Sequence, residues 1–254
     1  MTDASRRLLT PVYVKTDAEG DVPRDKECFY LLSRSGLFIG RNQPLMRSLV
    51  PALSWPRELE PQEPFLQLTY PKVPADILAD IIGFFWSIAD RHGAEAAVLL
   101  GYDGAMIVPI VPEQTGTIGW GYGGKPYPIG LHYDIPLELN GLRIIGDIHS
   151  HVFEAAYASS VDMQDERHRP GLHIVAGRLD RDPPAWHVEY VVDGARFPIA
   201  PEAVLDLNAY EGRVVPTDTT WTDRVQVMTA GEYARRHARP TSQNTSQYRT
   251  HSPR

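Results

Sequence analysis

The strongest constraint on the fold of this chain is a short apolar run, Leu142 to Ile148, followed directly by His149 and His151. The run predicts a buried β-strand. Because side chains two residues apart on a strand project to the same face, both imidazoles are expected to reach one point beyond the strand end. A loop then leads to Ser159-Ser-Val-Asp162, which predicts the start of a helix whose first turn carries the Asp162 carboxylate.

Two imidazoles and one carboxylate, with a fourth position left to water, form the ligand set of a catalytic zinc site. Each half of the pattern has an ordinary explanation: paired histidines at a strand end are commonly surface residues, and Ser-x-x-Asp commonly opens a helix. Both halves together, separated by seven residues, favour a metal site. A helix N-terminus also attracts a carboxylate, because its free N–H groups and positive dipole end favour negative charge.

The pattern His149-x-His151, seven residues, Ser159-x-x-Asp162 resembles the signature of the JAMM (JAB/MPN-type) zinc metalloproteases, which include deubiquitinases and bacterial peptidases. The resemblance implies an α/β (α+β) fold with the cytidine-deaminase-like core of JAB/MPN domains, a mixed β-sheet flanked by helices. It also implies that His149, His151 and Asp162 hold Zn²⁺.

A strand at 94–101 follows the clearest predicted helix, Ala75 to about His92, and contains one charged residue, Glu95. A carboxylate in an apolar strand is costly to bury unless it is paired or used, although Glu95 could also lie at an exposed strand entry. In JAMM proteins the catalytic glutamate lies at this place. The resemblance therefore implies that Glu95 transfers the proton of the attacking water, and that the Ser159 hydroxyl stabilises the oxyanion.

Composition limits the class of protein. The chain has 254 residues and a net charge of -7, which argues against a nucleic-acid partner. Its one cysteine, Cys28, excludes a disulfide within the chain and the cysteine ligands of a zinc deaminase. The N-terminus lacks the apolar segment of a signal peptide, and no run is long enough to span a bilayer. We expect a soluble, cytoplasmic protein with no membrane partner.

The domain organisation predicted from the sequence has three parts: a flexible N-terminal arm at 1–26, a metalloprotease domain at 27–215, and a disordered, basic tail at 216–254. A β-hairpin with its turn at Gly36 opens the domain. The proline-rich stretch 42–64 is predicted to cross irregularly, pinned to the core by four apolar side chains. These are Leu45, Leu49, Leu53 and Trp55.

Shorter elements are expected along the rest of the chain. Strands are predicted near 65–70, 106–111, 172–177, 186–192 and 197–199, and a short helix at 201–207. Among the histidines outside the motif, His132 is expected at the surface, and His168, His173 and His187 lack the spacing of the metal site.

The segment 113–140 is rich in glycine and aromatic residues and has two interpretations. It is either a mobile loop followed by a strand near 131–137, or a flap over the cleft that grips an extended peptide. In the family an insertion at this position contacts the ubiquitin tail, so Trp120 and Tyr122 are candidate substrate-binding residues.

Asp147 before the histidines and Val152 after them depart from the eukaryotic deubiquitinase pattern. The order of elements is more similar to bacterial JAB proteins encoded beside ubiquitin-like, E2-like and E1-like proteins, including protein A of ParB- and ThiF-related plasmid cassettes. This implies an isopeptidase or peptidase that cuts after the C-terminus of a ubiquitin-like modifier, with that modifier, its conjugates and E1-like or E2-like proteins as partners. The alternatives are a catalytically silent MPN scaffold and a metallopeptidase of small peptides.

Overall fold

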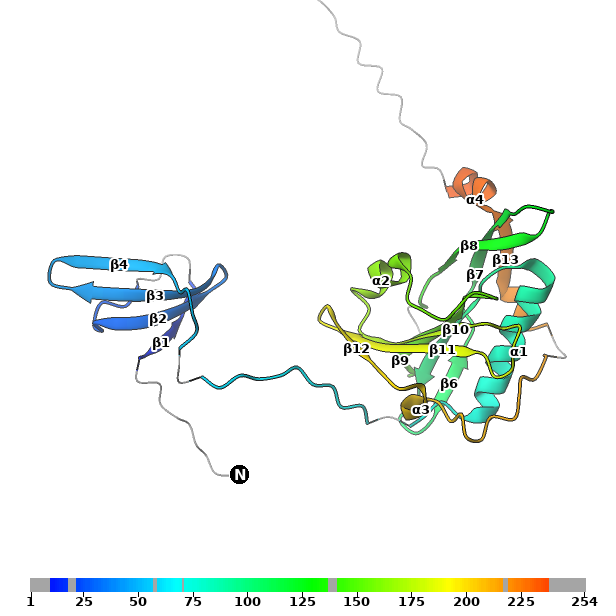
Figure 1. Cartoon of the computed structure of the whole chain (residues 1–254), viewed down its shortest axis with the longest axis horizontal. Coiled ribbons are helices and arrows are strands. Elements are labelled where there is room, and N and C mark those ends of the chain that lie inside the picture. Colours follow the sequence, from blue (N-terminus) through cyan, green and yellow to red (C-terminus); the bar gives the residue numbers. More distant parts are fainter. Residues whose placement is uncertain are drawn as a thin grey trace, which may run out of the picture. The chain divides into compact units, whose positions relative to one another are not determined.

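The computed structural model describes residues 10–17, 22–56, 59–69, 71–136, 141–216 and 219–237. The chain divides into two compact units, Met1–Leu66 and Gln67–Arg254 (Figure 1). The domain boundary predicted at residue 26 therefore differs from the division found between Leu66 and Gln67. The reason is that the predicted hairpin pairs with strands close to it in sequence, and so belongs to the first unit.

The first unit is a four-stranded sheet with the strand order β1-β2-β3-β4. Its strands are β1 (Val12–Val14), β2 (Cys28–Ser33), β3 (Gly36–Gln43) and β4 (Met46–Pro51). The predicted hairpin is confirmed as the antiparallel pair β2–β3, which turns at Gly36, where φ is 113° and favours glycine. Residues 12–14 of the expected arm pair with β2, and residues 46–51 of the expected irregular stretch pair with β3, so both segments are more ordered than predicted.

The apolar residues of the proline-rich stretch do not reach a core. Leu45 is 99% exposed, Leu53 is 102% exposed and Trp55 is 68% exposed, so the prediction that they pin the segment is wrong. The sheet instead buries Phe29, whose ring lies so close to Gly40 that a Cβ there would come within 2.1 Å of it.

The second unit is built around a six-stranded mixed sheet with the order β12-β11-β10-β9-β5-β6. Its strands are β5 (Ala97–Tyr102), β6 (Ile107–Ile110), β9 (Arg143–Ser150), β10 (Gly171–Gly177), β11 (Ala185–Val192) and β12 (Ala195–Pro198). Only β9 and β10 pair in parallel, and the other neighbours are antiparallel. With the helices that accompany it, this sheet confirms the predicted α+β class.

Helix α1 (Ala75–His92) has the bounds predicted from its apolar periodicity, and Gly93 ends it with φ of 63°. Its buried face joins the central strands in one apolar core. Figure 1 shows the helix beside the sheet. The fully buried side chains of this core include Leu78, Ile81, Ile82, Phe84, Phe85, Leu100, Ile148 and Ile174. Strands β9 and β10 approach so closely that a Cβ on Gly146 would come within 1.9 Å of the Leu172 carbonyl oxygen.

A three-stranded sheet with the order β13-β7-β8 completes the second unit. It contains β7 (Gln114–Trp120), β8 (Pro126–Tyr133) and β13 (Val225–Thr229), and helix α4 (Ala230–His237) follows β13. Residues 114–133 therefore form an antiparallel hairpin rather than a loop followed by a strand near 131–137. β8 ends at Tyr133, and Leu137 lies outside the described residues. Residues 225–237 lie in the expected unordered tail but form a strand and a helix, because β13 finds a parallel partner in β7.

Three shorter helices connect these elements: α2 (Ser160–Glu166), α3 (Pro201–Val204) and the 3-10 helix η1 (Thr222–Arg224). The strand expected near 65–70 is not formed by residues 61–69, and Tyr70 lies outside the described residues. Across the described ranges, no helix combines the length and apolar character needed to cross a membrane.

Candidate metal centre

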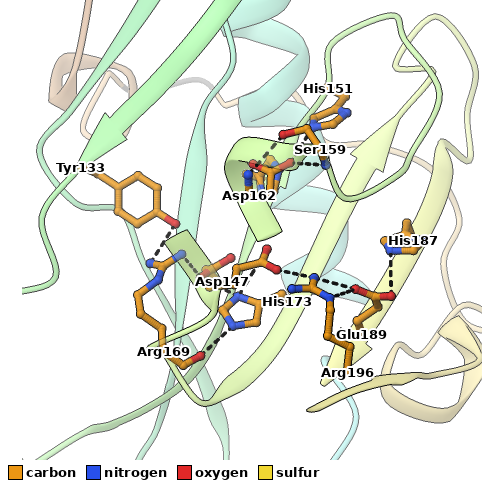
Figure 2. Close-up of polar contacts among 12 residues, drawn as sticks. Tyr133, Asp147, His151, Ser159, Asp162, Arg169, His173, His187, Glu189 and Arg196 are labelled. Atoms are coloured by element: carbon orange, nitrogen blue, oxygen red, sulfur yellow. Dashed lines mark hydrogen bonds and ion pairs between the residues drawn. The ribbon is translucent and has the colours of Figure 1, made fainter. Parts of the chain in front are cut away.

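His149, His151 and Asp162 converge as the sequence predicts. One ligand atom from each residue lies within 4.8 Å of the other two. The Nε2 atom of His149 is 3.6 Å from Asp162 Oδ1. The Nε2 atom of His151 is 3.5 Å from Asp162 Oδ2, and Figure 2 labels both of these residues. This is the arrangement expected of three protein ligands around one ion.

Pairing on both sides of β9 fixes the two imidazoles. His149 is paired with Ala97 of β5 on one side and with Val175 of β10 on the other. The backbone N–H of His151 then donates to the Ala176 carbonyl oxygen at 2.8 Å, which extends the same alignment past the strand end. The imidazole of His151 also packs edge-on against the Tyr157 ring, with 4.9 Å between the centroids.

The start of α2 fixes the carboxylate. Ser159 is the N-cap, and its hydroxyl oxygen accepts a hydrogen bond from the Asp162 N–H at 3.2 Å. The Asp162 Oδ2 atom in turn accepts from the Ser159 N–H at 2.7 Å, so the predicted capping box is present. The carboxylate therefore faces the histidines with its side chain already held by the helix end.

The polar atoms at this point suit a metal ion. The Nε2 atom of His149 is buried and has no hydrogen-bond partner among the described residues, although buried polar atoms are nearly always paired. Burial disfavours a charge on Asp162, yet the neighbouring imidazoles of His149 and His151 hold its pKa well below the ordinary value. Two imidazole nitrogens and one ionised carboxylate are ligands that Zn²⁺ and similar first-row ions accept.

Glu95 lies beside these residues. It comes just before β5 rather than within it, and the next residue, Ala96, is bonded to β9: its carbonyl oxygen accepts from the Ser150 N–H at 3.0 Å. By this register Glu95 lies opposite His151. Burial raises the pKa of the Glu95 carboxyl, an effect that the His149 and His151 imidazoles partly oppose. The half-buried carboxyl is thus in a low-dielectric place within the electrostatic reach of the triad.

A cleft of about 1150 Å³ contains Glu95, Ser159 and all three residues of the triad. Its lining also includes residues 128–135, from β8 and the chain just after it, and Tyr233, Arg236 and His237 of α4. Carboxylates outnumber basic side chains in the cleft lining. The carboxylates are those of Glu95, Glu113, Asp134, Glu154, Asp162, Asp165 and Glu166.

The two aromatic residues predicted to bind substrate do not line this cleft. Trp120 is 62% exposed at the end of β7, and Tyr122 is 108% exposed in the turn that follows. Their role in substrate binding stays a prediction, and it is β8 rather than the hairpin tip that borders the metal centre. His132 of β8 lies in the cleft wall and stacks on Tyr233 of α4, with 4.1 Å between the ring centroids.

Sequence reasoning missed a buried polar network next to the triad (Figure 2). Asp147 of β9 is 3% exposed, and its Oδ2 atom lies 3.1 Å from His173 Nδ1 and 3.2 Å from Arg169 Nη2. Burial alone would raise the pKa of Asp147, but the bond to His173 and the charge of Arg169 hold that pKa below its ordinary value. A signal was available, because Asp147 follows the apolar residues of β9, His173 is the polar residue of the otherwise apolar β10, and the two face each other in register.

The network continues away from the triad. Glu166, in the last turn of α2, is 2% exposed and pairs with Arg196 of β12, which also bonds Glu189 of β11 at 2.7 Å. The end of α2 is therefore anchored to the sheet by ion pairs. Because α2 carries Asp162 at its other end, these contacts also help to hold the position of that carboxylate.

A scan against protein-family models and a search of curated proteins find no match. Among solved structures, the chain is similar to the crystal structure of a JAB1/MPN domain protein from Archaeoglobus fulgidus. The two share 18% identity over 50% of this chain and 93% of that chain, with a TM-score of 0.32. At this level of similarity, the function has to be argued from the geometry of the site.

Proposed function

We propose that this chain is a zinc-dependent isopeptidase or peptidase of the bacterial cytoplasm, which hydrolyses the amide bond after the C-terminus of a ubiquitin-like modifier. The observation that carries the proposal is the convergence of His149, His151 and Asp162 in one cleft with Glu95 and Ser159. Metal-assisted amide hydrolysis requires metal ligands, a group that transfers the proton of water, and a hydrogen-bond donor to the oxyanion.

In this proposal His149, His151 and Asp162 hold the ion. A zinc ion bound there supplies a Lewis acid and a source of hydroxide near neutral pH. Glu95 accepts the proton of the attacking water and returns it to the leaving amine. The raised pKa of Glu95 suits a group that must both take and give a proton.

Ser159 has the second chemical role. Its hydroxyl oxygen accepts the Asp162 N–H, which leaves the hydroxyl hydrogen to be donated into the cleft. In this proposal that hydrogen goes to the carbonyl oxygen of the scissile amide as negative charge develops there. The capping bond fixes the Ser159 side chain, so the donor is already oriented before the substrate arrives.

The proposed substrate is the extended tail of a ubiquitin-like modifier. β8 is an edge strand that pairs with β7 on one side, and residues 128–135 border the cleft that contains the triad. A peptide can join such an edge through main-chain hydrogen bonds. The motif resemblance supports a modifier as the source of that peptide, with its conjugates and E1-like or E2-like proteins as partners.

The test has two stages. We expect purified wild type to contain about one zinc per chain and His149→Ala to contain little. Glu95→Gln should keep its zinc and lose hydrolysis of a fusion in which a ubiquitin-like protein is followed by a reporter, and Glu113→Gln serves as a matched carboxylate control on the same cleft. A fully active Glu95→Gln variant would refute the role of Glu95. A wild type without zinc, purified away from chelators, would favour the scaffold alternative.

A further inference from the structure

Arg169 joins three parts of the second unit that are distant in sequence. It lies between α2 and β10, and its Nη2 atom is 3.2 Å from Asp147 Oδ2 on the metal-binding strand β9. Its Nη1 atom donates to the Tyr133 hydroxyl oxygen at 3.3 Å, and the guanidinium lies 5.6 Å from the centroid of that ring. Tyr133 is the last residue of β8, the strand that forms the cleft wall.

The backbone around Arg169 is fixed on both sides. The Arg169 N–H donates to the Glu166 carbonyl oxygen at 2.9 Å, and the Arg169 carbonyl oxygen lies 2.9 Å from His173 Nε2. The backbone that carries the guanidinium is therefore fixed, and the planar group can contact Asp147 and Tyr133 at the same time. Asp147 is equally constrained, since it is 3% exposed and lies two residues before His149 on the same strand face.

We infer that Arg169 and Tyr133 are positioning residues that set the distance between the β8 wall and the metal-binding strand. Figure 2 shows the arginine between the tyrosine ring and the Asp147 carboxylate. Neither residue belongs to the metal triad, so the link acts on where the substrate lies rather than on the ion. This inference rests on the proposed function for its catalytic consequence, but the structural link itself does not.

The link predicts a specific pattern of effects. Tyr133→Phe removes the hydroxyl that Arg169 contacts and keeps the ring. Arg169→Lys keeps a cation beside Asp147 but gives up the planar fork that reaches both partners. Each change is expected to loosen β8 while zinc content stays at the wild-type value. For the proposed peptide reaction, KM should rise about threefold to tenfold with kcat within about twofold, because one hydrogen bond is lost from the wall and none from the triad.

The experiment uses the full chain loaded with zinc and compares Tyr133→Phe, Arg169→Lys and the double variant with Tyr127→Phe. Tyr127 is on the same strand, is 49% exposed and does not line the cleft, so it controls for loss of a hydroxyl from β8. Hydrogen exchange of residues 126–133 is measured by mass spectrometry. We expect exchange to accelerate about threefold to tenfold in both single variants, to stay unchanged in Tyr127→Phe, and to increase no further in the double variant.

Unchanged exchange in Tyr133→Phe and Arg169→Lys would overturn the inference, and so would additive effects in the double variant. If Arg169→Lys fails to fold, Tyr133→Phe decides alone. A fall in kcat with KM unchanged would also overturn it. If wild type does not hydrolyse the fusion, the proposed function fails, whereas the exchange data still decide whether Arg169 and Tyr133 hold the β8 wall.

Discussion

Asp162 has two tasks that substitution can separate, because its carboxylate both caps α2 and faces the two histidines. In the wild type, the Ser159 N–H donates to Asp162 Oδ2 at 2.7 Å. Asp162→Asn keeps a side-chain oxygen that can accept this hydrogen bond but removes the negative charge. Asp162→Ala removes both the ligand and the acceptor of the Ser159 N–H, which is one of the two bonds of the capping box. We therefore expect Asp162→Asn to lose metal binding with little loss of apo stability, and Asp162→Ala to lose both.

The magnitudes follow from known costs. Losing a helix N-terminal capping bond costs roughly 0.5–2 kcal/mol, and about 1 kcal/mol shifts Tm by roughly 2–4 °C in a unit of this size. Zinc at about one hundred times its Kd adds about 2.7 kcal/mol to the free energy of unfolding, which corresponds to a Tm increase of roughly 5–11 °C. The effect of zinc on Tm is therefore expected to exceed the effect of the cap.

The assay is thermal unfolding of chelator-treated protein, with and without added zinc. Wild type and Asp165→Asn, a variant of an exposed carboxylate on the same helix, should both show the zinc-dependent increase in Tm. Asp162→Asn should show none and should unfold within a few degrees of apo wild type. A full zinc-dependent increase in Asp162→Asn would refute the assignment of Asp162 as a ligand.

Three further outcomes are expected. Ser159→Ala should lower kcat by about 10²–10³ and apo stability by about 1 kcal/mol, while Ser160→Ala, measured in the same assays, should change neither much. Asp147 raises the pKa of folded His173 above its ordinary value, although burial opposes this. The stability from that pair is therefore complete below about pH 6.5 and is lost as the pH rises through the folded pKa. Urea unfolding of apo protein should show a lower free energy of unfolding at pH 9 than at pH 6, and His173→Gln should reduce this difference. A chain beginning at Gln67 should bind zinc as the full chain does, because every ligand lies in the second unit, and loss of binding would contradict that division.

The parts of the molecule that sequence predicts well are those specified by local pattern. The apolar spacing of α1 and its Gly93 end give its bounds, and the apolar run before His149 gives β9. The capping box of α2 gives the position of Asp162, because Ser159 and Asp162 satisfy each other within one turn. The triad could therefore be predicted from residues that lie within one short stretch of the chain.

The parts that sequence predicts badly depend on partners far along the chain. β13 is a strand because it pairs with β7, with Val225 beside Gln114 and Thr229 beside Ile118. The sequence around residue 225 does not identify that partner. Trp221, in the stretch expected to be unordered, packs edge-on against Phe84 of α1 with 5.6 Å between the ring centroids. Such long-range contacts have no local periodicity from which to infer them.

The site itself shows the same limit. Glu95 could be proposed from a lone charge beside an apolar strand, and the structure places it in the cleft. The same reasoning applied to Asp147 would have pointed to a buried ion pair, but its partner Arg169 follows α2 and could not be identified from spacing. Trp120 and Tyr122 stay candidates for substrate binding, but only the long-range pairing of β7 with β8 shows that residues 128–135 are the part of this hairpin that lines the cleft.

The capping box has a consequence for how such sequences diverge over time. Ser159 and Asp162 stabilise the start of α2 whether or not an ion is bound, so selection for a folded protein would retain them in a descendant that had lost its chemistry. The Nε2 atom of His149 makes no hydrogen bond to the described part of the chain. Selection for folding alone would therefore not retain this imidazole in the same way. In related chains, loss of His149 would therefore mark the loss of the proposed activity earlier than loss of the Ser-x-x-Asp half of the motif.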